Sequence, residues 1–187
     1  MTCSPKKERS MTSSTTTTEN VNQGPGLLSS DFALLRQSPV FSGIHHDVVK
    51  LFAYLSTHRS LKTGDYLIEQ GKKANQAFIL VKGAVEITVH HRHREIVLQQ
   101  LKPGAVFGEL ALLAKFNWFF SARAASDAEV IIIDQTAFQK VIEKFPEQKD
   151  KLIERVIQIR INRLESQTTF MLDQLLSTGE KPTEAIL

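Results

Sequence analysis

The residues with the clearest chemical potential lie in the stretch Phe107–Leu113, where a glycine and a glutamate lead directly into a short apolar helical turn. A helix N-terminus presents unpaired backbone N–H groups and a partial positive charge, so the turn at Gly108 could cradle an anionic group. Glu109 would repel a phosphate, and it fits only if it meets a hydrogen-bond donor such as a sugar hydroxyl beside that phosphate. The combination indicates a nucleotide.

Length and composition allow one domain of ordinary size with tails. The chain has 187 residues, of which 42% are apolar, enough to build a hydrophobic core. The net charge of +3 is modest and basic residues are mixed with acidic ones, which does not favour nucleic-acid binding. The single cysteine, Cys3, allows no disulfide, and no stretch resembles a membrane span or a secretion signal. We expect a cytoplasmic protein that binds no membrane.

The N-terminal part of the chain should be a disordered tail followed by short helices. Residues 1–28 are rich in Ser, Thr, Lys and Asn and include the run Ser13–Thr18, so they offer too little apolar surface to fold. Helical spacing of apolar residues begins after Ser30–Asp31 and again after His46–Asp47, and both pairs could cap a helix. The folded domain is therefore expected to span residues 29–145.

From Leu61 onward the pattern changes to short runs of strand-forming residues separated by glycines. Turn signals recur about every ten residues, which is typical of an antiparallel barrel or sandwich with a jelly-roll arrangement. The predicted strands are Tyr66–Ile68, Ala77–Val81, Val85–Val89, Glu95–Leu98 and Val130–Ile133.

A long helix is predicted after the barrel, over residues 146–178, with a short tail at 179–187. Asp134 can cap a preceding helix, and Pro146 suits the first position of the long one. Apolar residues cover more than one narrow stripe of this helix, so it needs a partner on two sides. One side can be the barrel, and the other can be a second subunit or the chain's own helices. Both alternatives remain open at this point.

Three segments resemble the cyclic nucleotide-binding domain, the sensor shared by catabolite-activator-type regulators, kinase regulatory subunits and gated channels. The segments are Lys62–Gly71, Leu80–Val85 and Lys102–Leu113, and the resemblance extends from about Asp31 to Leu164. It implies a mainly β fold with flanking helices: a double-stranded β-helix jelly-roll barrel, N-terminal helices and a long C-terminal helix. It also implies a regulatory role in signal transduction with cAMP or cGMP as ligand.

The resemblance assigns roles to the cassette residues. Gly108, Leu110 and Ala111 would offer backbone contacts to the ligand, and Glu109 would bond the ribose 2′-hydroxyl. In the family, an arginine a few residues later clamps the cyclic phosphate, because a guanidinium supplies two parallel charged donors. The family reads approximately Pro-Arg-Ala-Ala-Thr there.

This sequence departs from the family at that arginine. Aligned without a gap, the five family residues fall on Asn117–Ser121, so that Trp118 replaces the arginine and Phe119 and Ser121 complete the candidate ligand-binding set. An indole carries no charge to offset a phosphate. An alternative alignment uses Arg123 as the clamp, but it needs two compensating length changes. If Trp118 faces the barrel interior, strand alternation also turns Arg123 outward.

Three explanations fit the aromatic cluster of Phe116, Trp118, Phe119 and Phe120. The rings could fill the old pocket as core, which would leave a structural or dimerisation module. The pocket could instead be re-tuned to an apolar or aromatic ligand, with Glu109 as a polar anchor. A cyclic nucleotide could also still bind weakly through Glu109 and the helix N-terminus.

A metal enzyme is the remaining alternative, because cupins share the jelly roll and use a His-x-His motif followed by Glu. His91 and His93 would share a strand face here, but the spacing to Glu95 is too short and the neighbouring arginines oppose a cation. An exposed basic hairpin tip explains the segment better. No catalytic triad or coupled carboxylate pair is evident either, so we expect neither catalytic residues nor a metal site.

The expected output is therefore contact with other proteins. Glu180 to Leu187 are the only residues after the long helix, so the sequence offers no helix-turn-helix module and DNA binding is not expected. A protein partner or a homodimer through residues 146–178 is the predicted route.

Overall fold

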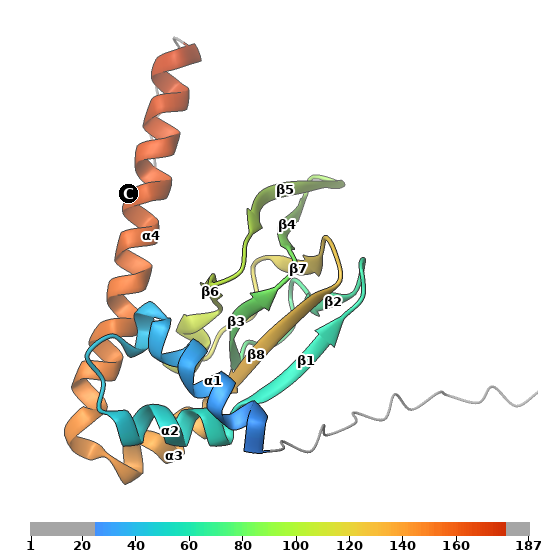
Figure 1. The fold of residues 1–187 in the computed structure, drawn as a ribbon. Helices are drawn as coiled ribbons and strands as arrows, with labels where there is room; N and C mark the ends of the chain where they lie inside the picture. Colours follow the sequence, from blue (N-terminus) through green and yellow to red (C-terminus); the bar gives the residue numbers. More distant parts are fainter. Residues whose placement is uncertain (1–24, 179–187) are drawn as a thin grey trace, which may run out of the picture.

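A computed structural model of the chain describes residues 25–178 and shows two four-stranded antiparallel sheets flanked by helices (Figure 1). The strand orders are β1-β8-β3-β6 and β2-β7-β4-β5. This arrangement confirms the predicted jelly-roll barrel with N-terminal helices and a long C-terminal helix. The strands are β1 Thr57–Leu61, β2 Tyr66–Ile68, β3 Gln76–Lys82, β4 Val85–His91, β5 Arg94–Leu101, β6 Val106–Phe107, β7 Ser121–Ala124 and β8 Ala128–Asp134.

The helices precede or follow the strands in the chain, except for one short 3-10 turn between β6 and β7. They are α1 Pro25–Gln37, η1 Pro39–Phe41, α2 His46–Leu55, η2 Glu109–Leu112, α3 Gln135–Lys144, η3 Pro146–Gln148 and α4 Lys149–Thr178. Asp134 caps α3 as predicted, since its Oδ1 accepts a hydrogen bond of 2.6 Å from the Ala137 N–H. Among the described helices, none has the length and apolarity that crossing a membrane would require.

The β1-β8-β3-β6 sheet separates two hydrophobic cores. Alternation along β3 sends Ala77 and Ile79 to the helical side, and Phe78 and Leu80 to the barrel interior. Such a strand is apolar on both faces, which explains its unbroken apolar sequence. Helices α1, α2 and α3 and the first part of α4 cover the helical side, while the rest of α4 extends away from the barrel (Figure 1).

All five predicted strands are present, and three short ones were missed. Strands β1, β6 and β7 lack a recognisable apolar run, because they contain polar residues or only two residues. Helix α1 begins at Pro25, inside the segment predicted to be a tail, and Asp31 lies within it rather than capping it. The remainder of the predicted tails, residues 1–24 and 179–187, lies outside the described part of the chain.

A buried contact between Asp31 and His58 joins α1 to β1. Asp31 is fully buried, and its Oδ1 lies 2.6 Å from Nε2 of His58. The other carboxylate oxygen, Oδ2, has no hydrogen-bond partner among the described residues. His58 is therefore not an ordinary solvated histidine, because its Nε2 is the hydrogen-bond partner of Oδ1 in the buried Asp31 carboxylate.

Removing this contact should destabilise the protein. We expect His58→Ala to lower the free energy of unfolding by on the order of 3 kcal/mol, because Asp31 would remain buried without a partner. His58→Gln, which keeps a donor, should lose less. Urea unfolding followed by circular dichroism measures both. His91→Ala, which changes an exposed histidine, is the control, and an equal loss in all three variants would contradict the assignment.

Candidate functional site

The cassette turn sits at the junction of the two cores. It leaves β6 at Phe107, passes through Gly108 and continues into η2. Gly108 has a φ of +75°, a left-handed conformation that favours glycine. A Cβ at this position would lie 2.9 Å from the Gln76 carbonyl oxygen and 2.9 Å from Cη2 of Trp118. The Gln76 backbone therefore packs against one side of the turn, and the Trp118 indole packs against another.

Trp118 fills the barrel interior beside this turn. Only 6% of its surface is exposed, and its ring centroid lies 5.4 Å from Phe116, 5.3 Å from Phe120 and 6.5 Å from Phe78. Its backbone is fixed as well, because Trp118 N donates to Lys72 O at 2.8 Å and Trp118 O accepts from Gly71 N at 2.7 Å. The indole is therefore a packed core group on the barrel side of the cassette.

Glu109 points to the other side, toward α4. It is 3% exposed, and its Oε2 lies 3.5 Å from Nη1 of Arg163. Arg163 also donates through Nη2 to the backbone carbonyl oxygen of Val106. A buried carboxylate needs a partner of this kind. The charge that compensates Glu109 is a guanidinium from the long helix.

Arg123 lies on the outer face of the β2-β7-β4-β5 sheet, as strand alternation predicts. Its neighbour Ala122 is fully buried in the barrel, whereas its own Nη2 and Nη1 lie 3.4 Å from Glu86 and 3.9 Å from Glu95. The hydrogen bond to Glu86, and then the charge of Glu95, raise the pKa of the Arg123 guanidinium above its usual range. The side chain is occupied outside the barrel.

The predicted ligand-binding residues are therefore not gathered around one space. Gly108 and Ala111 share the barrel side with Trp118, whereas Glu109 faces α4. Ser121 points to the outer sheet face, where its Oγ accepts from Gln70 N at 3.0 Å, and Phe119 is 58% exposed. Leu110 is half-buried and belongs to neither core.

Comparison with known proteins identifies the family of the central part of the chain. Residues 58–145 match the family model described as the cyclic nucleotide-binding domain. These residues belong to the cyclic nucleotide-binding domain family. The fold agrees, since a cyclic nucleotide-binding domain from Methylobacillus flagellatus, 13% identical, aligns with a TM-score of 0.71 over 85% of this chain and 86% of its own.

Two further relatives show a similar range. A cyclic nucleotide-binding-like protein from Brucella abortus is 26% identical, with a TM-score of 0.56 over 61% of this chain and 98% of its own. The HTH-type transcriptional regulator Cmr of Mycobacterium tuberculosis is 26% identical over 103 residues, which are 55% of this chain and 42% of the regulator. The chain thus spans less than half the length of that relative.

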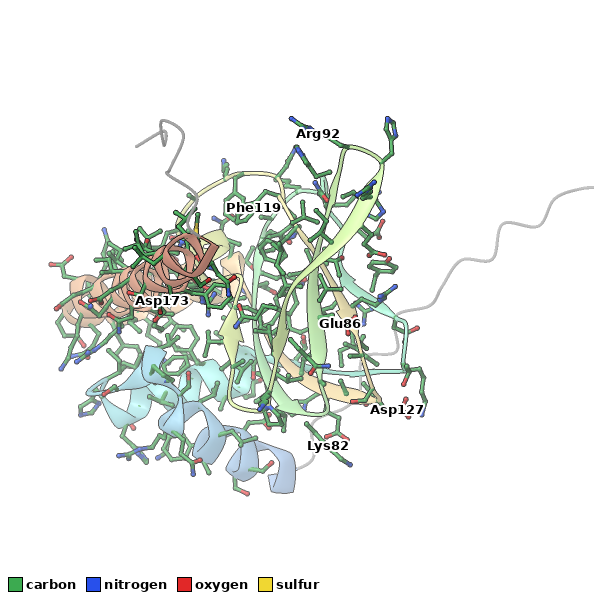
Figure 2. The ribbon with its side chains drawn as sticks, turned by 90° about the horizontal axis from the view of Figure 1, so that it is seen from above. Lys82, Glu86, Arg92, Phe119, Asp127 and Asp173 are labelled. Carbon is green, nitrogen blue, oxygen red and sulfur yellow. The ribbon has the colours of Figure 1, made fainter. Side chains whose placement is uncertain are left out.

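The basic hairpin between β4 and β5 lies at one end of this cyclic nucleotide-binding domain, the end that also carries Phe119 (Figure 2). Arg92 and His93 adopt positive φ angles of 46° and 63°, which form a tight turn. Within residues 25–178, no three His, Cys, Asp or Glu side chains are placed to hold a metal ion.

Arg163 is the site residue that sequence reasoning missed. A usable signal existed, because Leu152, Val156 and Ile159 pack on the helical core and Arg163 continues their spacing of four, three and four residues. A charged residue at the end of a buried helix face should have a buried partner. The cassette glutamate, an acid next to an apolar turn, is a natural candidate for that partner.

The contact between Gly108 and the indole can be tested by mutation. We expect Gly108→Ala to lower the free energy of unfolding by roughly 3 kcal/mol, because it adds both a left-handed alanine and a clash. Gly104→Ala is the matched control, since Gly104 has a φ of +88° and a Cβ added there would meet nothing within 4 Å. This control should cost only about 1 kcal/mol. Equal losses in denaturant unfolding would refute the contact.

Proposed function

We propose that this chain is a regulatory domain of the cyclic nucleotide-binding fold that works without a cyclic nucleotide bound in the family's usual mode. The observation that carries the proposal is the burial of Trp118 among aromatic rings at the position where the family has its phosphate-clamping arginine. The domain acts through protein contacts and not as an enzyme. We expect neither cyclic AMP nor cyclic GMP to affect the domain.

The charges around the cassette support this proposal. A cyclic phosphate in a barrel interior needs a cation, and an indole supplies at most one neutral N–H donor. Arg123 is paired with Glu86 and Glu95 on the outer face. Arg163 is paired with Glu109, and this pair also removes the carboxylate that would meet the ribose. Arg123, the alternative phosphate clamp, and Glu109, the candidate acceptor for the ribose hydroxyl, are thereby both engaged in other ion pairs.

A re-tuned pocket for an apolar or aromatic ligand is the second candidate. The enclosed space nearest to Glu109 lies on the helical side, between Phe41, Phe52 and Phe138, and has a volume of only about 10 Å³. A space of this size has room for one water molecule at most. An apolar ligand would have to displace packed rings, so the core-filling explanation is preferred.

Nucleotide titration tests the main proposal. We expect neither cAMP nor cGMP to change the thermal unfolding of the chain. A ligand that binds only the folded state would stabilise it by about 2.7 kcal/mol at a hundredfold excess over Kd, which a thermal-shift assay detects easily. Trp118→Arg, which restores the family residue, should gain a nucleotide response even though it lowers the stability of the unliganded domain.

Two outcomes of this titration would contradict the proposal. Stabilisation of the unmodified chain by either nucleotide would show that the cassette still binds. If Arg123→Ala then abolished the effect, the alternative alignment would be the correct one. A response to an aromatic compound, without a response to nucleotides, would favour the re-tuned pocket.

Pairing of α4 with a second copy of the chain is the proposed route of output. One face of α4 packs on its own domain through Leu152, Val156 and Arg163. Another face carries exposed apolar residues spaced alternately by four and three, and Thr168 and Leu175 continue the same spacing. This is the a/d pattern of a two-stranded coiled coil. The exposed residues are Ile157, Ile161, Leu164 and Met171.

Charge complementarity favours a parallel, in-register pair. With Ile161 and Leu164 at positions a and d, Arg160 takes position g and Glu165 takes position e of the following heptad. In a parallel coiled coil these two positions face each other across the two helices, so Arg160 of each copy would meet Glu165 of the other. Two symmetric ion pairs would then flank the apolar seam.

Disrupting the seam should shift the chain toward monomer. We expect Leu164→Asp to raise the dimer dissociation constant about a hundredfold or more, because it places a charge in a core layer of both helices. Leu176→Asp is the matched control, since Leu176 is equally apolar and 81% exposed but lies off the seam. Sedimentation equilibrium measures both variants, and a strictly monomeric unmodified chain at high concentration would exclude the dimer.

A further inference from the structure

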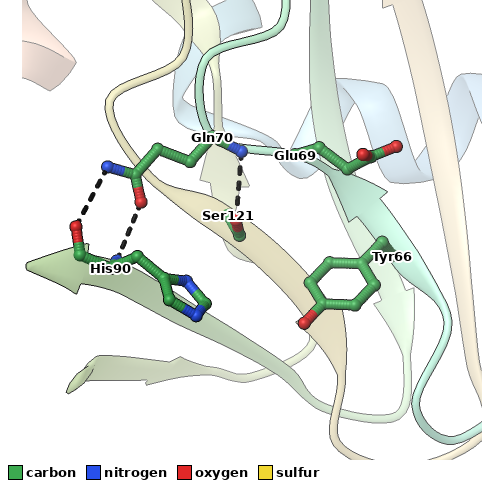
Figure 3. A pocket seen from close by; sticks show the side chains of 5 residues that line it. All are labelled: Tyr66, Glu69, Gln70, His90 and Ser121. Carbon is green, nitrogen blue, oxygen red and sulfur yellow. Dashed lines mark hydrogen bonds between the residues drawn. The ribbon is translucent and has the colours of Figure 1, made fainter. Parts of the chain in front are cut away.

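A second hollow lies on the outer face of the barrel, across the sheet from Trp118. It has a volume of about 320 Å³ and lies on the β2-β7-β4-β5 sheet (Figure 3). Ser121 on β7 points into it, while the next residue, Ala122, points into the barrel interior. The hollow is thus separated from Trp118 by the thickness of the sheet. Its lining residues are Tyr66, Glu69, Gln70, His90 and Ser121.

Hydrogen bonds hold the walls of this hollow in place. The side chain of Gln70 bonds the backbone of His90 at both ends, since its Oε1 accepts from His90 N at 2.8 Å and its Nε2 donates to His90 O at 3.4 Å. Gln70 N donates to Ser121 Oγ at 3.0 Å (Figure 3). The chain after β2 is thereby tied to both β4 and β7. A site whose walls are already fixed loses less conformational entropy when a ligand binds.

The Ser121 hydroxyl at the floor of the hollow provides unused hydrogen-bonding capacity. Ser121 is 5% exposed, and its cross-strand partner on β4 is Thr88. Thr88 is fully buried, and its Oγ1 has no hydrogen-bond partner among the described residues. Thr88 does not line the hollow, whereas Ser121 does. The Ser121 oxygen accepts from Gln70 N, and its own O–H remains available as a donor to a molecule in the hollow.

We propose that this hollow binds a small, neutral, polyhydroxylated ring, of the monosaccharide or cyclitol class. Ser121, His90 and the phenol of Tyr66 can each donate and accept, which matches hydroxyl groups that do the same. The ring of Tyr66, 41% exposed, offers an apolar face to the C–H side of such a ring. Ligand pockets begin at about 300 Å³, so the hollow suits a small molecule.

The charges of the site exclude an anionic ligand. Glu69 is the charged residue in the lining, and it would repel an anion. Arg123, which pairs across strands with Tyr66 on this sheet, is held by Glu86 and Glu95. Among the described lining residues no cation remains to favour a carboxylate or a phosphate. Apart from Ser121 the site uses none of the candidate cassette residues, and it lies on the opposite face of the sheet from Trp118, so its test stands apart from that of the proposed function.

NMR titration of the full chain with D-glucose and with myo-inositol tests this proposal. We expect at least one of them to give saturable shifts of the backbone amides of Gln70, His90 and Ser121, with a dissociation constant on the order of 1 mM because the hollow is open. Tyr66→Ala should abolish the saturable shifts. Tyr54→Ala, which changes the chain's other tyrosine, also exposed, should leave them unchanged.

D-glucuronate, the charged comparison that keeps the pyranose ring, should give smaller shifts than D-glucose. The absence of saturable shifts with both neutral probes would overturn the proposal, as would shifts that survive Tyr66→Ala. Stronger binding of glucuronate would overturn the assignment to a neutral ligand. Because Tyr66 is exposed and its backbone pairing is kept in Tyr66→Ala, loss of folding should not obscure the result, and the unchanged remainder of the spectrum verifies this.

Discussion

The close approach of the Trp118 indole to the Gly108 turn is the constraint on which the cassette depends. Glycine is the only residue type that combines a φ of +75° with the absence of a Cβ that would meet Cη2 of Trp118 at 2.9 Å. The indole in turn is held by three phenylalanine rings and by two backbone hydrogen bonds. The turn therefore keeps the family's shape while the space beside it is filled by protein.

The same turn connects the barrel interior to α4. Ala111 packs on the barrel side, and Glu109, two residues earlier, pairs with Arg163 on the helical side. Closely packed cores have little spare volume, so a displacement on one side of the turn tends to be passed to the other. Any change in how the barrel is filled would be felt at Arg163, one residue before Leu164 of the proposed seam. Under the proposed function, the pair of Glu109 and Arg163 would be the link from the cassette to α4.

Sequence reasoning recovered the fold well because the family's turns and apolar runs are local signals. Strand alternation alone also placed Arg123 outside the barrel, since Trp118, Phe120 and Ala122 share the interior face. The orientation of Glu109 could not be read in this way. It depends on Arg163, 54 residues away, and on which side of a short 3-10 turn the carboxylate leaves. Likewise, the pairing of Asp31 with His58 joins a helix to a strand that lacked any recognisable pattern.

Under the proposed function, an aromatic residue at the place of the clamping arginine has an energetic advantage. An arginine that waits for a phosphate inside an apolar barrel is a charge without a partner, and removing a buried charge in favour of packed apolar atoms is often stabilising. Such a gain in stability impairs function only if that function was ligand binding. If the domain works through α4, as proposed, it keeps a turn fixed by Gly108 and a cassette carboxylate whose positive partner, Arg163, lies on that helix.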